Sequence, residues 1–160
     1  MKLSLVNIDA EVAAELHALP AGQDEWRQLS LGGLGTLVRE VLDLNEGIRQ
    51  SRWGGYLSID DERRLVVGTC AFKGRPDAAG AVEIAYFTFP GHEARGYATA
   101  MARELVGIAE RSGEVSLVVA HTLREENASV RLLRKLAFRG PRDVEDPEDG
   151  AIWRWERALL

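Results

Sequence analysis

A glycine-containing loop between an apolar run and a helical pattern holds the residue types best suited to chemistry. It extends from Pro90 to Thr99 and contains Gly91 and Gly96. Backbone N–H groups converge on an anion at the start of a helix, and a glycine such as Gly96 removes a side chain where the backbone must approach a ligand. Arg95 adds positive charge beside it. The loop predicts a phosphate site, with a simple tight turn as the alternative.

Two elements must position this loop. The run Val82–Phe89 is almost wholly apolar and predicts a strand covered on both faces. After the loop, apolar residues recur at helical spacing, which predicts a helix over Gly96–Ser112 that Gly113 ends. The sequence therefore predicts a strand, a loop and a helix in succession, at the centre of a mixed α/β layer fold.

The remaining elements follow from the same periodicities and from Gly and Pro breakers. We expect strands at Lys2–Ile8, Tyr56–Ile59, Leu65–Phe72, Val115–His121, Phe138–Val144 and Ala151–Arg157, and helices at Ala10–Leu19, Leu34–Gln50 and around Val130–Ala137. Thr122 and Glu125 fit a capping box before the last of these helices.

Composition limits the class of protein. A chain of 160 residues fits one domain, and we expect residues 1–160 to form it. The net charge of −5 argues against broad binding to nucleic acid. No window reaches the roughly 20 apolar residues that span a bilayer, and no signal peptide is visible. We therefore expect a cytoplasmic protein that does not insert into a membrane.

Cysteine and histidine usage predicts neither a disulfide nor a metal site. Cys70 is the only cysteine and lies in an apolar run, so we expect it in the core. The three histidines, His17, His92 and His121, are too scattered for a metal-binding motif.

Three stretches in order along the chain resemble the GNAT acetyltransferase superfamily. Glu93 to Ala98 is similar to its motif of Gln or Arg, two residues, Gly, one residue, then Gly or Ala, with glutamate at the first position. Asn127 to Phe138 resembles the Asn-led helix that ends in Lys-Leu-Gly-Phe, with Ala137 in place of the glycine. The third stretch, Val82 to Tyr86, and the placement of Ser129 are most similar to the Rim-type branch of ribosomal-protein N-terminal acetyltransferases.

The resemblance implies a mixed, mostly antiparallel central sheet flanked by helices. It also implies acetyl-CoA as cofactor and direct transfer of the acetyl group to a primary amine, either a protein N-terminus or a small molecule. Before about residue 80 the chain resembles the superfamily in element order only, so the acceptor stays open. The oligomeric state stays open between a monomer and a homodimer.

The resemblance places cofactor contacts on the strand end, the loop and the first turn of the helix. The implied cofactor-binding residues are Phe87, Thr88, Phe89, Glu93, Ala94, Arg95, Gly96, Tyr97, Ala98, Thr99 and Asn127. A backbone N–H around Phe87 to Phe89 would serve as oxyanion donor. The Asn127 amide can bond the pantetheine amides, with simple helix capping as the alternative.

Glu83 is the candidate base. It is the only acidic residue in its apolar strand, and burial raises the pKa of a carboxylate toward the range that suits a base. In the superfamily a glutamate on this strand often takes the amine's proton, directly or through water. The alternative is an edge position where Glu83 pairs with an arginine.

Ser129 is the candidate general acid. Many members of the superfamily carry a tyrosine six residues after the helix asparagine, but here that position is Leu133, which cannot donate a proton. The Rim-type branch has a serine near the sulfur, at the position of Ser129. A cap or a small packing residue is the alternative.

A non-catalytic acyl-CoA-binding or sensing domain is the alternative to an enzyme, because fold alone does not ensure activity. Two residues, Trp26 and Trp53, are candidates for the lining of an acceptor pocket, whereas Trp153 and Trp155 are expected in the core or on the sheet face. The acidic turn between Asp143 and Asp149 offers attraction for an amine, or solvated surface only.

Overall fold

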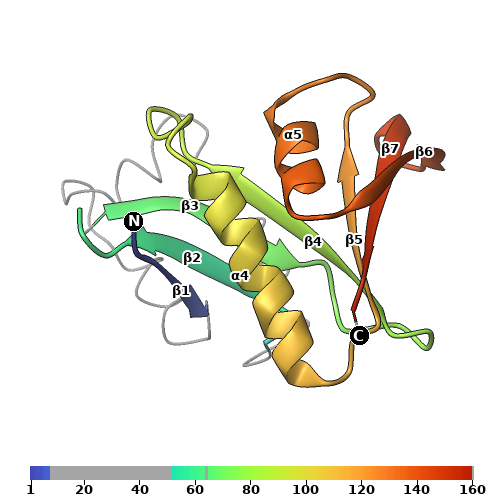
Figure 1. The fold of residues 1–160 in the computed structure, drawn as a ribbon, viewed down its shortest axis with the longest axis horizontal. Coiled ribbons are helices and arrows are strands. Elements are labelled where there is room, and N and C mark those ends of the chain that lie inside the picture. The colour runs from blue at the N-terminus through green and yellow to red at the C-terminus, as the bar shows by residue number, and fades with distance from the viewer. Residues whose placement is uncertain (8–51, 64, 160) are drawn as a thin grey trace.

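The computed structural model describes residues 1–7, 52–63 and 65–159. Within them lie seven strands and two helices (Figure 1). The strands are β1 (Leu3–Asn7), β2 (Gly55–Asp60), β3 (Leu65–Phe72), β4 (Ala81–Thr88), β5 (Leu117–Thr122), β6 (Arg139–Asp146) and β7 (Gly150–Ala158), and the helices are α4 (Tyr97–Ser112) and α5 (Ala128–Lys135). The helices expected at 10–19 and 34–50, and Trp26, lie outside the described residues.

The strands form one sheet in the order β1-β2-β3-β4-β5-β7-β6. All neighbours are antiparallel except β4 and β5, which run parallel and are connected through α4. A parallel pair needs a long crossover, and the helix predicted after the loop supplies it. The expected mixed, mostly antiparallel sheet flanked by helices is confirmed.

The parallel pair is short, and this is what opens the site. β4 and β5 pair only over Ala81–Glu83 and Leu117–Val119. Beyond Glu83, β4 continues to Thr88 while β5 turns away, and the two strands diverge toward α5 (Figure 1). The sheet therefore splits at its centre into two parts that separate like a wedge.

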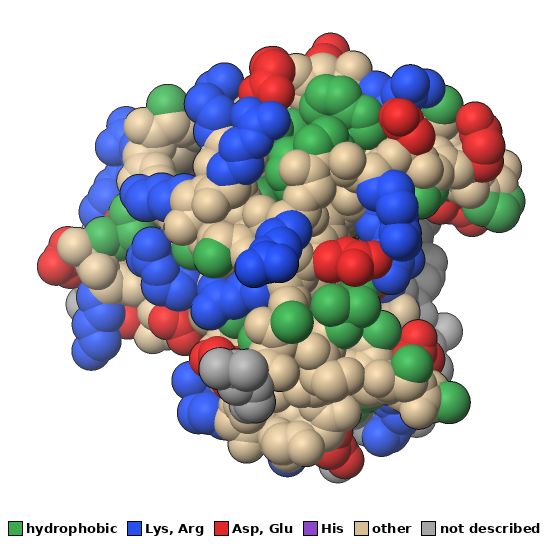
Figure 2. All heavy atoms as spheres, turned by 45° about the vertical axis from the view of Figure 1, so that its right-hand side comes forward, with side chains coloured by type: hydrophobic (Ala, Val, Ile, Leu, Met, Phe, Trp, Pro, Cys, Tyr) green, Lys and Arg blue, Asp and Glu red, His purple; other side chains and the backbone are tan. Residues whose placement is uncertain are grey.

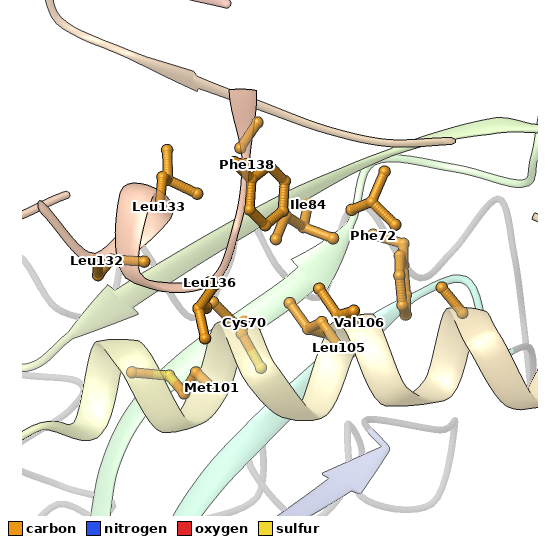
Figure 3. Packing of buried hydrophobic residues seen from close by; sticks show 14 of the residues in the cluster. Cys70, Phe72, Ile84, Met101, Leu105, Val106, Leu132, Leu133, Leu136 and Phe138 are labelled. Carbon is orange, nitrogen blue, oxygen red and sulfur yellow. The ribbon is translucent and has the colours of Figure 1, made fainter. Parts of the chain in front are cut away.

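The core lies between α4, α5 and one face of the sheet (Figure 3). From α4, Met101 and Leu105 are fully buried, and from α5, Leu133. This burial is why the apolar residues of α4 recur at helical spacing. Cys70 belongs to the same cluster, and burial raises the pKa of its thiol to about 12, so it is a core residue as expected.

Three local expectations were wrong. β4 is not covered on both faces, because Val82 and Ile84 are buried but the alternate residues are only partly so. Trp53 packs edge-on against Phe72 in the core, with 3% of its surface exposed, so it does not line an acceptor pocket. Thr122 ends β5 and does not cap a helix; its hydroxyl accepts a hydrogen bond from the indole N–H of Trp155 at 3.0 Å.

None of the helices in the described ranges is long and apolar enough to cross a bilayer. Over the same ranges, no cluster of three His, Cys, Asp or Glu side chains is arranged to hold a metal ion.

Candidate active site

The loop before α4 leaves backbone N–H groups without a partner among residues 1–7, 52–63 and 65–159. Gly96 is the N-cap residue, in the left-handed region at φ 85°, and no side chain caps the helix. The first helical hydrogen bond runs from the Ala100 N–H to the Gly96 carbonyl. The N–H groups of Tyr97, Ala98 and Thr99 therefore point out of the helix start without a helical acceptor, which is the arrangement that binds phosphate.

Glu93 holds the loop in shape. Its carboxylate Oε2 accepts a hydrogen bond from the Gly91 N–H at 2.8 Å, and the following Ala94 has a left-handed φ of 60°. Glu93, which stands where the superfamily motif has Gln or Arg, is thus hydrogen-bonded within its own loop, to the Gly91 backbone. Arg95 is exposed beside it. Figure 2 shows that Lys and Arg side chains also gather over part of the face that it draws. Local positive charge is present although the chain is acidic as a whole.

Tyr97 fixes the first turn of α4 to the sheet. Its side chain is buried, donates a hydrogen bond to the Asp60 carboxylate and accepts one from Arg63 at 2.9 Å. Burial of this ring leaves only the backbone of Tyr97 for a cofactor.

The backbone groups of β4 point alternately toward β3 and toward β5. This alternation decides which of Phe87, Thr88 and Phe89 has an N–H that could face a cofactor. The Glu83 carbonyl accepts from Lys73 and the Phe89 N–H donates to Val67 at 2.8 Å, so odd-numbered residues of β4 turn their backbone groups toward β3. Alternation then turns those of Tyr86 and Thr88 toward the diverging β5. Phe89 is therefore occupied as a donor, and Thr88 is the residue of the predicted trio whose N–H faces the wedge.

A pocket of about 280 Å³ fills the space where β4 and β5 separate. Residues from β4, β5, α5 and the β6–β7 turn line it, and they include both Glu83 and Ser129. The two side chains that the sequence singled out for proton transfer are 46 positions apart in the chain, yet the structure brings them to one cavity. The loop residues Glu93 to Thr99 do not line this pocket.

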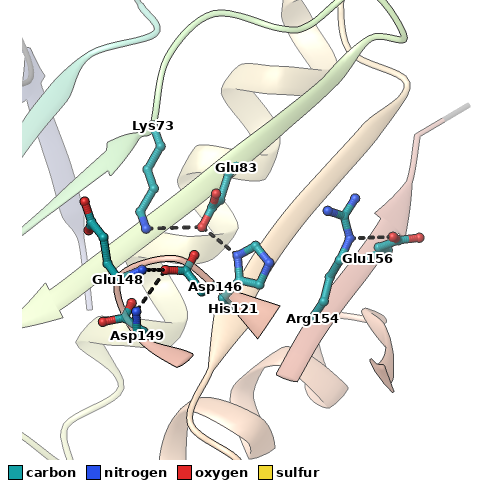
Figure 4. A network of polar contacts seen from close by, with 8 residues as sticks. All are labelled: Lys73, Glu83, His121, Asp146, Glu148, Asp149, Arg154 and Glu156. Carbon is teal, nitrogen blue, oxygen red and sulfur yellow. Dashed lines mark hydrogen bonds and ion pairs between the residues drawn. The ribbon is translucent and has the colours of Figure 1, made fainter. Parts of the chain in front are cut away.

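Glu83 does not stand alone in apolar surroundings. Its side chain is 27% exposed, and its Oε1 lies 2.7 Å from Nδ1 of His121 and 3.2 Å from Nζ of Lys73 (Figure 4). The expected alternative, pairing with an arginine, is replaced by a lysine and a histidine. Sequence reasoning set His121 aside because it fits no metal motif.

Ser129 also has a partner that sequence reasoning missed. Its Oγ lies 2.7 Å from Oη of Tyr86, on β4. Burial raises the pKa of the Tyr86 hydroxyl, while the hydrogen bond to Ser129 opposes the rise. The available signal was that Tyr86 is the one tyrosine of this mostly apolar strand. Leu133, at the position of the superfamily's tyrosine, is fully buried.

Asn127 is the N-cap of α5. Its Oδ1 accepts a hydrogen bond from the Val130 N–H at 3.0 Å, which is the capping role foreseen as the alternative. Its amide Nδ2 makes no hydrogen bond within the described part of the chain. A cofactor contact would therefore come from Nδ2, with the cap retained.

The family model of the acetyltransferase (GNAT) domain matches residues 3–139. The chain therefore belongs to the GNAT acetyltransferase family, whose members use acetyl-CoA as cosubstrate. No curated protein sequence gives a significant match.

Several solved structures share the fold over nearly the whole chain. The ribosomal L7/L12 N-acetyltransferase RimL, in complex with CoA, is 16% identical with a TM-score of 0.69, covering 98% of this chain and 94% of that one. yncA from Salmonella typhimurium, with its cofactor acetyl-CoA, is 17% identical with a TM-score of 0.62, covering 100% and 94%. A GNAT-family protein from Bordetella pertussis is 26% identical with a TM-score of 0.66, covering 98% and 96%.

The match to a GNAT acetyltransferase from Bacillus anthracis is shorter. It covers 65% of this chain and 65% of that chain, with 16% identity and a TM-score of 0.56. The chain thus spans just under two thirds of that protein.

Proposed function

We propose that this protein transfers the acetyl group of acetyl-CoA to a primary amine within the pocket between β4 and β5. The pyrophosphate binds the uncapped start of α4, on the backbone of Glu93 to Thr99. The pantetheine arm then enters the wedge, where the backbone of Tyr86 and Thr88 faces it. The roles that we give below to Glu83 and Ser129 in proton transfer are part of the same proposal.

The observation that carries this function is that Glu83 and Ser129 line one pocket at the place where the strands separate. Acetyl transfer needs a group that takes a proton from the amine and a group that protonates the thiolate. Glu83 belongs to the first side, with His121 and Lys73. Ser129 belongs to the second side, with Tyr86. The two groups would serve the two proton transfers that the reaction needs.

The chemistry also needs a donor for the tetrahedral oxyanion. The N–H of Thr88 is the best candidate on β4, because it faces the wedge by strand alternation while that of Phe89 is bonded to Val67. Asn127 Nδ2, at the start of α5, is placed to bond a pantetheine amide.

Among acceptors, we favour a peptide N-terminus. Two observations support this choice: the serine at position 129, as in the Rim-type branch, and the likeness in fold to RimL, which acts on a ribosomal protein N-terminus. A small amine is the other acceptor class, and the cofactor site is the same for both.

The test of cofactor binding is the melting temperature with and without acetyl-CoA, because a ligand that binds the native state stabilises it. The wild-type protein should melt at a higher temperature with saturating acetyl-CoA. Gly96→Glu should abolish the shift, because it puts bulk and negative charge at the phosphate site. The matched control is Gly113→Glu at the other end of α4, where φ is 71° and a Cβ would meet nothing within 4 Å. It should melt lower but keep the shift.

The test of catalysis is release of free CoA with a panel of tetrapeptides carrying free N-termini and of small amines. Turnover on any member supports the enzyme. Binding of acetyl-CoA without turnover on the whole panel favours the sensing domain. No shift in melting temperature with acetyl-CoA, CoA or longer acyl-CoAs would show that the cofactor site is wrong.

A further inference from the structure

His121 and Glu83 form a close pair because of the short parallel ladder. Glu83 is the last residue of β4 paired with β5, opposite Val119, and His121 lies two residues beyond Val119. Side chains two residues apart on a strand share a face, so Glu83 and His121 project to the same side. The distance from Nδ1 to Oε1 is 2.7 Å, in the range of a charge-assisted hydrogen bond.

This contact favours one tautomer of the ring when Glu83 is ionised. An ionised carboxylate only accepts hydrogen bonds, so Nδ1 must be the donor. In the neutral imidazole, Nε2 then has the free lone pair. Nε2 makes no hydrogen bond with any described residue, and the ring lines the pocket. His121 is therefore held as a proton acceptor, and Nε2 is its accepting atom.

Glu83 is less well placed to take the proton itself. Both His121 Nδ1 and Lys73 Nζ address the same oxygen, Oε1 (Figure 4). A proton arriving at Oε1 would have to displace one of these two donors, so Oε2 is the one oxygen of Glu83 that could take a proton without breaking one of these contacts. The Lys73 backbone N–H also bonds the Glu83 carbonyl at 2.8 Å, so the lysine is anchored next to the carboxylate.

The charged groups around the His121 ring include carboxylates that would stabilise a transient positive charge on it. Lys73 is the cation nearest to the pair. Opposing it are the carboxylates of Glu83 and of Asp146, which interacts electrostatically with both His121 and Lys73, and that of Asp149 on the pocket wall. Arg154, the register partner of His121 on β7, is held by Glu156 at 2.7 Å. The carboxylates near His121 would stabilise an imidazolium.

We propose that His121 Nε2 takes the proton from the acceptor amine and that Glu83 is the positioning residue that orients the ring. The proposal deepens the acetyl transfer proposed above and rests on it. The acceptor ammonium gives one proton to Nε2, and the freed amine nitrogen forms a bond to the thioester carbonyl carbon. As the carbonyl re-forms, the C–S bond breaks, and the second proton of the nitrogen ends on the thiolate. The imidazolium then releases its proton to water.

The first test needs no acceptor. In the ¹⁵N spectrum of histidine-labelled protein, we expect the His121 ring in the tautomer with hydrogen on Nδ1 near neutral pH. The signal is assigned by its absence from His121→Asn. A ring with hydrogen on Nε2 would overturn the proposal, even if acetyl-CoA binds and the protein turns over.

The second test compares two variants on the best acceptor of the tetrapeptide and amine panel. His121→Asn can still donate to Glu83 but has no base, and kcat should fall roughly 10²–10⁴-fold. Glu83→Gln can still accept from Nδ1, so its loss should be smaller. Both variants should keep the acetyl-CoA shift in melting temperature. A large loss in Glu83→Gln with near wild-type turnover in His121→Asn would make Glu83 the base and overturn the proposal.

Chemical rescue separates a base from a structural residue. Imidazole added to His121→Ala should restore turnover in proportion to its unprotonated concentration, because it can occupy the vacated space. Ser129→Ala is the matched control. It should be slow because protonation of the thiolate is impaired, and added imidazole should not restore its turnover. Equal responses of the two variants to imidazole would contradict the role of His121.

Discussion

The hydroxyl of Tyr86 lies 2.7 Å from the hydroxyl of Ser129, which joins the free end of β4 to the first turn of α5. The contact spans 43 positions of sequence and crosses the opening of the wedge. Both groups can donate and accept, so a proton lost by Ser129 can be replaced from Tyr86. The serine that the sequence assigned as acid is therefore one member of a pair.

This pair predicts non-additive losses of activity. Ser129→Ala and Tyr86→Phe should each lower kcat by roughly 10²-fold, the lower end of the contribution of a positioned acid. The double variant should be no slower than the slower single variant, because residues that act as a unit do not contribute independently. Steady-state kinetics on one acceptor measures all four proteins. Losses that multiply would show that the two hydroxyls act separately.

Asn127 allows capping and cofactor binding to be separated. Asn127→Ala removes both functions and should lower the stability by about 1 kcal/mol while weakening acetyl-CoA binding. Asn127→Asp keeps an oxygen for the Val130 N–H but lacks the Nδ2 donor. It should retain the melting temperature and lose cofactor affinity. Thermal melts and calorimetric titration with acetyl-CoA measure the two effects, and unchanged affinity in both variants would leave Asn127 as a cap only.

The anchor of α4 predicts a pH-dependent stability difference. The hydrogen bond from Tyr97 is the largest cause that holds the pKa of Asp60 below its ordinary value of 3.8. A lowered carboxyl pKa in the folded state means that the stabilisation is present above 3.8 and is lost as the pH falls through the lower folded value. Tyr97→Phe should melt several degrees below wild type at pH 7, and the gap should narrow below pH 4.

The control for this prediction is Tyr56→Phe. The Tyr56 hydroxyl donates to the backbone carbonyl of Arg52 at 2.7 Å, so the lost bond does not involve a carboxylate. Its melting difference from wild type should not narrow at low pH. A Tyr97→Phe gap that stays constant from pH 7 to pH 3 would mean that Asp60 contributes nothing through this bond.

Two glycines should respond to alanine with opposite signs. A Cβ on Gly68 would overlap the Phe87 carbonyl oxygen and lie 3.1 Å from Met101 Cε, so Gly68→Ala should cost about 1–3 kcal/mol. Gly107 lies inside α4, where a Cβ would meet only the flexible end of Arg111 at 2.9 Å. Gly107→Ala should stabilise by about 0.5–1 kcal/mol, because glycine is a poor helix former. Each kcal/mol corresponds to roughly 2–4 °C in melting temperature.

The spacing of apolar residues, together with Gly and Pro as breakers, was sufficient to predict most of the described helices and strands. β3 was predicted at its observed bounds, and α4 ends at Gly113 as expected because that glycine adopts a left-handed φ of 71°. Local signals failed where two residues fitted one role. Thr122 and Asn127 are both good helix caps by type, and only tertiary packing, with Thr122 under Trp155, decides between them.

The site was predicted less completely than the fold, because its contacts join residues that are distant in sequence. His121 lies 38 positions from Glu83, and Tyr86 lies 43 positions from Ser129. Neither pair follows from local spacing, since each depends on β4 lying next to β5 and on α5 covering the wedge. The apolar strand and the resemblance together predicted Glu83, the resemblance predicted Ser129, and the structure supplied the partners of both.

The short pairing of β4 with β5 also has a mechanical consequence. Only three residue pairs between β4 and β5 join the β1–β4 part of the sheet to the β5–β7–β6 part. A pantetheine arm between the strands would take up backbone groups of β4 in the way a further strand does, and so would brace the two parts against each other. Hydrogen exchange at the amides of Tyr86 and Thr88 should then slow on cofactor binding, while amides of the long β6–β7 hairpin exchange as before. The cosubstrate would then be a temporary part of the sheet as well as a reactant. When CoA leaves, β4 and β5 would again be joined only by their three residue pairs.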